Sequence, residues 1–119
     1  MSKKYVIEGG NKLEGTTYVS GSKNASLPII AATLLNGGIN KLYNVPNIHD
    51  TKMMFKILEL LGCKIKRNNG KIIVDSRNIH NHEIPENLMS QMRSSVIIAG
   101  ALLSRSKKVV FTYPGGYDF

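Results

Sequence analysis

Cysteine, acidic side chains and long hydrophobic runs are all scarce in this chain of 119 residues. Its single cysteine, Cys63, excludes an internal disulfide and fits a reducing compartment. The N-terminus has no long apolar segment of the kind that a secretory signal needs, and the apolar stretches are too short and too interrupted to span a bilayer. We therefore expect a cytoplasmic protein.

Acidic residues number 8 against 16 lysines and arginines, which gives a formal net charge of +8. Such a charge suits nucleic acid, a membrane surface or an anionic small molecule. The basic residues are scattered along the chain, however, and no aromatic side chains alternate with them as they do on a base-stacking surface. We expect no nucleic-acid and no membrane partner, and we expect a minority of the charges to face a phosphorylated substrate.

The residues that are present are typical of a globular protein with a real core, since 42% are hydrophobic and 20% are charged. Apolar alternation predicts strands, and apolar positions at helical spacing predict helices. The expected strands cover residues 5–7, 17–20, 39–45, 63–67, 71–74 and 109–113, and the expected helices cover 24–35, 51–61 and 88–103. This order indicates an α/β (α+β) fold with one βαβαββ unit over roughly residues 16–75 and the start of a second.

Local signals define several boundaries of these elements. Asp50 is expected to cap the helix 51–61 at its N-terminus, and Gly62 to end it. Asn69-Gly70 predicts a type I′ hairpin. Cys63, at the start of a strand, is interpreted as a small buried residue rather than as a nucleophile.

The stretch 21–28, Gly-Ser-Lys-Asn-Ala-Ser-Leu-Pro, lies between an expected strand and an expected helix. Such a turn forms an anion site, because free backbone N–H groups and the helix dipole favour negative charge there. Lys23 adds a positive charge, and Asn24 adds an amide that both donates and accepts. The plainer interpretation is that Ser22 or Asn24 merely caps the helix and that Lys23 is solvated, and the octet by itself leaves both open.

Three other polar residues, Arg93, His80 and His82, have side chains capable of binding or catalysis. Arg93 lies near the start of the expected helix 88–103, where a cation opposes the helix dipole unless it meets an anion. The alternative is a surface arginine that reaches solvent. His80 and His82 lie in an irregular polar segment without further ligands nearby, so they are interpreted as loop histidines, and we expect no metal site.

Five short motifs stand in a characteristic order, at residues 21–28, 44–46, 61–63, 92–95 and 114–116. In this order and spacing the chain resembles the enolpyruvyl transferases over its whole length. It most resembles the branch that acts on UDP-N-acetylglucosamine in peptidoglycan synthesis, because the sister enzymes that use shikimate 3-phosphate usually carry serine where this chain has Asn24.

The resemblance implies an "inside-out" α/β barrel of βαβαββ units, of which this chain is about the first quarter to third. Residues 1–20 would be opening strands that pack with a second domain, and residues 21–119 the first unit and part of the second unit of the catalytic domain. The implied partners are the missing remainder of the two-domain fold and two small molecules, phosphoenolpyruvate and UDP-N-acetylglucosamine. The implied reaction moves the enolpyruvyl group to the 3-hydroxyl of the amino sugar, releases phosphate, and uses no metal or organic cofactor.

The family's site residues carry over position by position. Lys23 and Asn24 match the residues that bind phosphoenolpyruvate, and Arg93 matches an arginine that contacts UDP-N-acetylglucosamine. Tyr117 stands at the position of the family's catalytic cysteine, directly after Pro-Gly-Gly. A tyrosine, with a pKa near ~10 and no thiolate chemistry, should not replace that cysteine. We therefore expect these 119 residues alone to have no transferase activity.

Several alternatives stay open from the sequence. One is an enolpyruvyl transferase of the shikimate branch. Another is a non-catalytic module that keeps anion binding through Lys23 and Arg93, or a decayed fragment without a role. A nucleic-acid binder rests on net charge alone.

Overall fold

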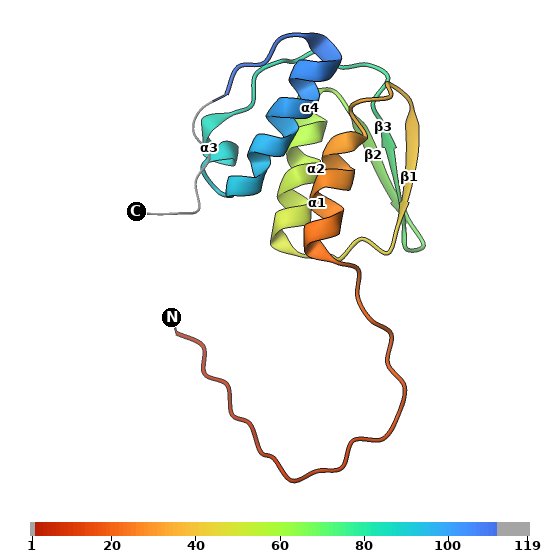
Figure 1. Cartoon of the computed structure of the whole chain (residues 1–119), viewed down its shortest axis with the longest axis vertical. Helices are drawn as coiled ribbons and strands as arrows, with labels where there is room; N and C mark the ends of the chain where they lie inside the picture. The colour runs from red at the N-terminus through yellow and green to blue at the C-terminus, as the bar shows by residue number, and fades with distance from the viewer. Residues whose placement is uncertain (1, 112–119) are drawn as a thin grey trace.

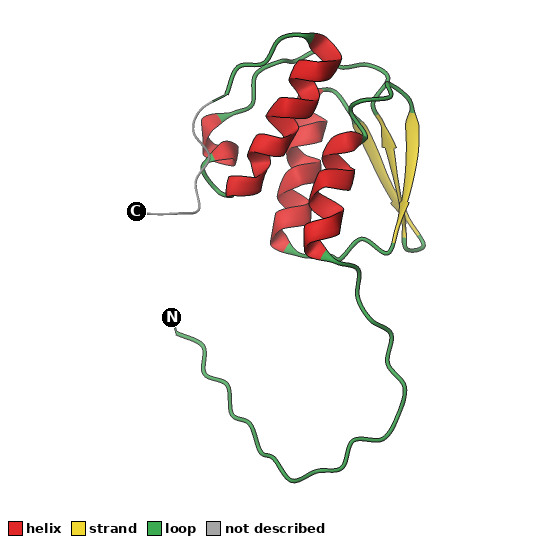
Figure 2. Cartoon of the chain, viewed as in Figure 1, coloured by secondary structure: helices red, strands yellow, loops and turns green. Residues whose placement is uncertain are grey.

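The computed structural model of the chain describes residues 2–111. The elements in chain order are α1 (Lys23–Ala32), β1 (Ile39–Tyr43), α2 (His49–Leu61), β2 (Lys64–Asn68), β3 (Lys71–Asp75), α3 (Glu86–Met89), the 3₁₀ turn η1 (Arg93–Ser95) and α4 (Val96–Ser106). A layer of helices covers one face of a small sheet, and the N-terminal segment extends away from both (Figures 1 and 2). None of the helices described is long and apolar enough to cross a bilayer.

The sheet has three strands in the order β1-β3-β2, and β3 is antiparallel to both neighbours. Asp75 at the end of β3 is opposite Ile39 of β1 on one side and Lys64 of β2 on the other. Asn69 and Gly70, which join β2 to β3, have φ angles of 48° and 76°. Both angles are positive, as a type I′ turn requires, so the predicted hairpin is confirmed.

The core lies between the helical layer and the sheet. The apolar positions at helical spacing in α2 are Met54, Ile57, Leu58 and Leu61, and all are buried there. Phe55 of the same helix is the largest of the fully buried side chains. Cys63 is a buried free thiol within this core, as expected. Besides Phe55, the apolar side chains exposed by less than 2% are Ile30, Ala31, Leu34, Met54, Ile57, Leu58, Leu61, Val74, Ile84, Met89, Ile98 and Leu102.

The prediction that Asp50 caps α2 is wrong by two residues. Ile48 is the N-cap, and Asp50 lies in the first turn of the helix. Thr51, rather than Asp50, pairs with backbone groups at the start of α2. Its hydroxyl accepts from the backbone N–H of Ile48 at 3.3 Å and donates to the Pro46 carbonyl at 2.7 Å. The side chain of Asp50 is therefore available for another partner. Gly62 ends the helix as predicted, at a φ of 122°.

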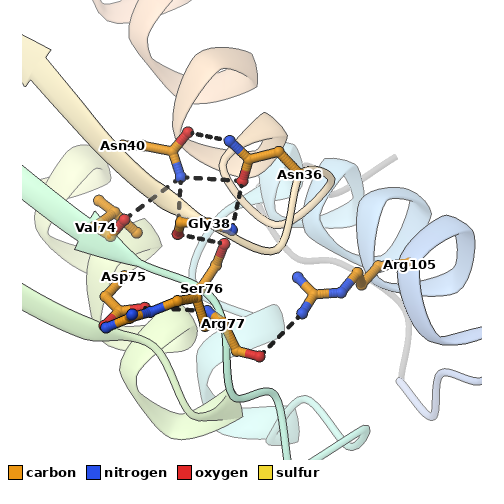
Figure 3. A network of polar contacts seen from close by, with 8 residues as sticks. All are labelled: Asn36, Gly38, Asn40, Val74, Asp75, Ser76, Arg77 and Arg105. Atoms are coloured by element: carbon orange, nitrogen blue, oxygen red, sulfur yellow. Dashed lines mark hydrogen bonds and ion pairs between the residues drawn. The ribbon is translucent and has the colours of Figure 1, made fainter.

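A polar network joins the C-terminal end of α1 to β3 and α4 (Figure 3). Asn40 donates to the carbonyls of Thr33 and Val74, and the buried Ser76 hydroxyl donates to Thr33 at 2.6 Å. Arg105 of α4 donates to the Leu34 carbonyl at 2.7 Å. These bonds satisfy carbonyl groups that a helix end otherwise leaves without partners.

The strands expected at residues 5–7 and 17–20 are not formed. Residues 2–20 run in extended conformation with exposed side chains, and Tyr5, Ile7 and Tyr18 are each more than four-fifths exposed. A strand is defined by hydrogen bonds to a neighbour, and the described residues offer this segment none. The division into residues 1–20 and 21–119 stays a prediction.

The helix expected over residues 88–103 is broken in two. α3 ends at Met89, Met92 is extended, and the helix resumes after η1. The hydroxyl of Ser95 donates to the Met92 carbonyl at 2.6 Å and lies 3.3 Å from the Met89 carbonyl, so a side chain takes the place of backbone partners. The expected strand 109–113 is represented by one parallel bridge between Glu83 and Val110, and its last two residues lie outside the part described.

Candidate functional site

Three helices begin at the same end of the molecule. α1, α2 and α4 run in one direction, with their N-terminal ends away from the polar network (Figure 1). A cavity of about 550 Å³ lies at this end, lined by Lys23, Asn24, Leu27, Asp50, Gln91, Met92, Arg93, Ser94, Val96 and Ile97. Helix N-termini present free N–H groups and partial positive charge, so this end of the molecule favours an anion.

Lys23 is the first residue of α1, and a capped turn holds it in place. The Ser22 hydroxyl accepts from the backbone N–H of Ala25 at 3.2 Å, and the Ser26 hydroxyl donates to the Ser22 carbonyl at 2.6 Å. The ammonium of Lys23 lies 3.0 Å from a carboxylate oxygen of Asp50 on α2. The ion pair therefore joins the first turns of two parallel helices at the cavity.

Gly21 brings this turn against the loop that precedes α2. A Cβ atom at Gly21 would overlap the backbone carbonyl of Asn44, which itself has a positive φ of 57°. A side chain larger than hydrogen would push the two segments apart. The close approach explains why a glycine opens the stretch 21–28.

Arg93 and Asn24 also belong to the polar lining. Asn24 follows Lys23 in the first turn of α1, and Arg93 opens the 3₁₀ turn that leads into α4. Both side chains are exposed at the cavity. The lining thus has two cations, Lys23 and Arg93, against one carboxylate, and three helix N-termini add partial positive charge. Such a cavity is suited to a ligand with more than one negative group.

The structure brings Lys23, Asn24 and Arg93 together, although Arg93 is 70 residues from Lys23 in the chain. Ser22 does cap α1, as the plainer interpretation held, and Lys23 is partly exposed as well as paired. Tyr117 lies outside the residues described. Sequence reasoning missed Asp50, because an acidic residue at a helix start was interpreted as a cap; parallel helices place such first turns side by side.

The remaining candidate residues lie away from the cavity. Burial raises the pKa of the Cys63 thiol to about 11, Arg105 opposes that shift and Asp75 adds to it. The thiol is therefore protonated at neutral pH and unreactive. Within residues 2–111, no group of three or more His, Cys, Asp and Glu side chains could hold a metal ion. His80 and His82 lie in the loop before α3, as predicted.

Comparison with known proteins defines the class to which this fold and cavity belong. The EPSP synthase (3-phosphoshikimate 1-carboxyvinyltransferase) family matches residues 7–118. A solved structure, the enolpyruvyl transferase NikO from Streptomyces tendae, is similar with a TM-score of 0.72 and 26% identity, over 82% of this chain and 23% of that one. The chain belongs to this enolpyruvyl transferase family.

The curated relatives narrow the branch. A UDP-N-acetylglucosamine 1-carboxyvinyltransferase 2 from Caldanaerobacter subterraneus is 46% identical over 115 residues, which are 97% of this chain and 28% of the relative. A UDP-N-acetylglucosamine 1-carboxyvinyltransferase from Desulfatibacillum aliphaticivorans is 42% identical over 95% of this chain and 27% of the relative. The chain thus spans little more than a quarter of the length of the relatives it matches.

Proposed function

We propose that the chain forms one side of the active site of a UDP-N-acetylglucosamine 1-carboxyvinyltransferase, in the cytoplasm. The observation that carries the proposal is the cavity in which Lys23, Asn24 and Arg93 meet beside three helix N-termini. In the proposed reaction the 3-hydroxyl of the amino sugar takes the enolpyruvyl group of phosphoenolpyruvate, and phosphate leaves. This step belongs to peptidoglycan synthesis.

The charges of the two substrates fit the lining of the cavity. Lys23 and the N-terminus of α1 would hold the phosphate of phosphoenolpyruvate, with Asn24 donating from the next position. Arg93 would donate two hydrogen bonds from its planar guanidinium to two oxygens of the diphosphate of the sugar nucleotide. An anion at this end also offsets the cost of two cations near helix N-termini, which is otherwise unfavourable.

The chain by itself should bind without turnover. The family's cysteine position is occupied by Tyr117, which has no comparable thiolate at neutral pH. Catalysis also requires groups held on both sides of a cleft, and relatives of this chain are more than three times its length. Phosphoenolpyruvate and UDP-N-acetylglucosamine mixed with the chain should therefore release no phosphate.

Amide chemical shifts of the ¹⁵N-labelled chain test the binding half of the proposal. Phosphoenolpyruvate should shift the signals of residues 22–26, and UDP-N-acetylglucosamine should shift those of residues 92–96. Lys23→Met should weaken phosphoenolpyruvate binding about 10- to 150-fold, because a hydrogen bond to a charged group contributes about 1.5–3 kcal/mol. Arg93→Met should weaken binding of the sugar nucleotide by a similar factor.

Lys56→Met is the matched control, since Lys56 is an exposed lysine of α2 that does not line the cavity. It removes the same charge and should leave both affinities within twofold. Unchanged phosphoenolpyruvate binding in Lys23→Met would contradict the assignment of the site.

Two alternatives have distinct outcomes in the same titrations. Shikimate 3-phosphate should bind at least tenfold more weakly than UDP-N-acetylglucosamine, and the opposite order would favour the shikimate branch, after which the matching family is named. Equal binding of any phosphate ester, without preference for the sugar nucleotide, would favour a non-catalytic anion-binding module.

A further inference from the structure

A second cavity lies beside the hairpin of β2 and β3, and it shares no lining residue with the cavity at the helix N-termini. Its volume is about 310 Å³. It is lined by residues 45–47, by Thr51, Lys52 and Phe55 of α2, and by residues 67–72 of the hairpin. We call this cavity the hairpin pocket. The reaction proposed above uses none of these residues.

The hairpin pocket carries positive charge without a carboxylate to balance it. Lys52, Arg67 and Lys71 belong to its lining, and the described lining has no Asp or Glu. Within residues 2–111, none of these three side chains forms an ion pair. Because three cations lie around one small space, the pocket attracts an anionic group.

Arg67 is oriented by an aromatic ring. Its guanidinium carbon lies 5.3 Å from the centroid of the Phe55 ring, which is within the range of a cation–π contact. Phe55 is almost fully buried and belongs to the core, so it gives the guanidinium a rigid support. Among the residues that the structure describes, the guanidinium donates no hydrogen bond. Its planar set of donors is therefore available for two oxygens of a phosphate.

The rest of the lining fits a flat ring better than it fits a bare anion. Val45, Pro46 and Ile72 are half-buried and add apolar surface to the pocket. Asn47 and Asn68 are exposed there, and neither side-chain amide forms a hydrogen bond within residues 2–111. An amide both donates and accepts, so it is complementary to the edge of a nucleobase.

Size selects among ligands that combine a flat ring with a phosphate. Small-molecule pockets usually measure about 300–1,000 Å³, so the hairpin pocket is at the lower end of this range. We propose that the hairpin pocket binds a nucleoside monophosphate. The base lies against the apolar side chains, Asn68 bonds to the edge of the base, and Arg67 and Lys52 bind the phosphate.

Titration of the ¹⁵N-labelled chain with adenosine 5′-monophosphate tests the proposal. The amide signals of Asn47, Lys52 and residues 67–72 should shift, whereas those of residues 22–26 should stay in place. Inorganic phosphate and adenosine each supply only one half of the ligand, so each should bind at least tenfold more weakly. Equal affinity for inorganic phosphate would overturn the proposal, because the apolar surface would then contribute nothing.

Arg67→Met should weaken binding of adenosine 5′-monophosphate at least tenfold, because it removes charge-assisted hydrogen bonds to the phosphate. Lys66→Met is the matched control, since Lys66 is an exposed lysine that precedes Arg67 on β2 and does not line the pocket. It removes the same charge and should leave the affinity within twofold. Equal losses in the two variants would overturn the proposal, because they would reflect net charge alone.

Two further variants test the site without touching the support of Arg67 on Phe55. Lys52→Met changes an exposed side chain and should weaken binding of adenosine 5′-monophosphate at least threefold. Asn68→Ala should weaken binding of the nucleotide and leave that of inorganic phosphate unchanged. Unchanged nucleotide binding in both variants would contradict the assignment of the pocket.

The inference does not rest on the proposed reaction, and the two can fail separately. Lys23→Met should leave binding of adenosine 5′-monophosphate within twofold, because Lys23 does not line the hairpin pocket. Absence of shifts in residues 67–72 at millimolar nucleotide would overturn the inference and leave the cavity at the helix N-termini unaffected.

Discussion

At the scale of single residues, an anion that binds the Lys23 ammonium must compete with the carboxylate of Asp50, which already forms an ion pair with it. The pair measures 3.0 Å and is partly exposed, with half of the Lys23 side chain reaching solvent. Exposed pairs of this kind contribute about 0.2–1 kcal/mol. Asp50 therefore reduces the attraction of the cavity for phosphate but leaves two donors of the Lys23 ammonium for a ligand.

Asp50→Asn should tighten binding of inorganic phosphate to the chain about 1.4- to 5-fold, because it removes the competing charge and keeps the shape of the side chain. Isothermal titration at low ionic strength measures the change. Asp75→Asn is a suitable comparison, since Asp75 pairs with Arg77 and does not line the cavity. It removes the same charge and should leave phosphate binding nearly unchanged. Weaker phosphate binding in Asp50→Asn would mean that the carboxylate orients Lys23 rather than competing for it.

Cys63 gives a second prediction at this scale. Its pKa is raised from 9.0 to about 11 in the folded chain, so at pH 8 the folded state holds about 100-fold less thiolate than the unfolded state. A disulfide reagent should therefore react about 100-fold faster in urea than in buffer.

The raised pKa of Cys63 also makes the free energy of unfolding fall as pH rises from about 9 to 11, because the unfolded chain loses the thiol proton first. Urea denaturation at a series of pH values measures the loss, and Cys63→Ala should remove it. Rapid labelling of Cys63 in the folded chain would contradict the raised pKa of its thiol.

At the scale of helices and strands, elements with strong local signals were predicted well. The apolar spacing of α2, the glycine that ends it and the Asn69-Gly70 turn each depend on a few neighbouring residues. The sequence could also locate the loop histidines and the buried Cys63. These features need little knowledge of the rest of the molecule, because helix periodicity and turn geometry are local properties.

Elements that depend on distant partners were predicted less well. Tyr18 and Val19 have the composition of a strand, but strand formation requires a neighbour that residues 2–111 do not supply. The break before α4 depends on the hydroxyl of Ser95, which bonds two carbonyls that an unbroken helix would pair differently. Neither requirement is visible in the apolar pattern, which continues across the break through Met89 and Met92.

The contact of Gly21 with Asn44 leads to a prediction about how α1 joins the loop before α2. Gly21→Ala should lower the free energy of unfolding by about 1–3 kcal/mol, because the methyl group overlaps a backbone carbonyl that cannot rotate away. Urea denaturation followed by circular dichroism measures the loss. Gly9→Ala, in the exposed segment with nothing within 4 Å, should change stability by less than about 0.5 kcal/mol. Equal stability of both variants would contradict this prediction and would mean that the loop carrying Asn44 moves to accommodate the methyl group.

At the scale of the whole molecule, the site depends on the shared direction of three helices. Lys23 was predicted from the turn before α1, Arg93 from its place near a helix start, and both from the family resemblance; the fold brings both to one cavity. Asp50 could not be found in this way, since its role follows from the packing of α1 against α2. Local signals and the resemblance predicted the positions, and the parallel helices place them at one cavity where helix N-termini favour negative charge.

The polar network around Arg105 and Ser76 holds the C-terminal end of α1, so a small tilt at that end would move the N-terminal end by a larger distance. The C-terminal end is tied to β3 and α4 near Leu34, whereas Lys23 stands at the other end, about 16 Å away at 1.5 Å per residue. A tilt of only about 4° at the tied end would move Lys23 by about 1 Å, a displacement that can cost an enzyme about a hundredfold in rate. The position of the first turn of α1 thus depends on bonds at the opposite end of the helix as well as on its own contacts with Asn44 and Asp50.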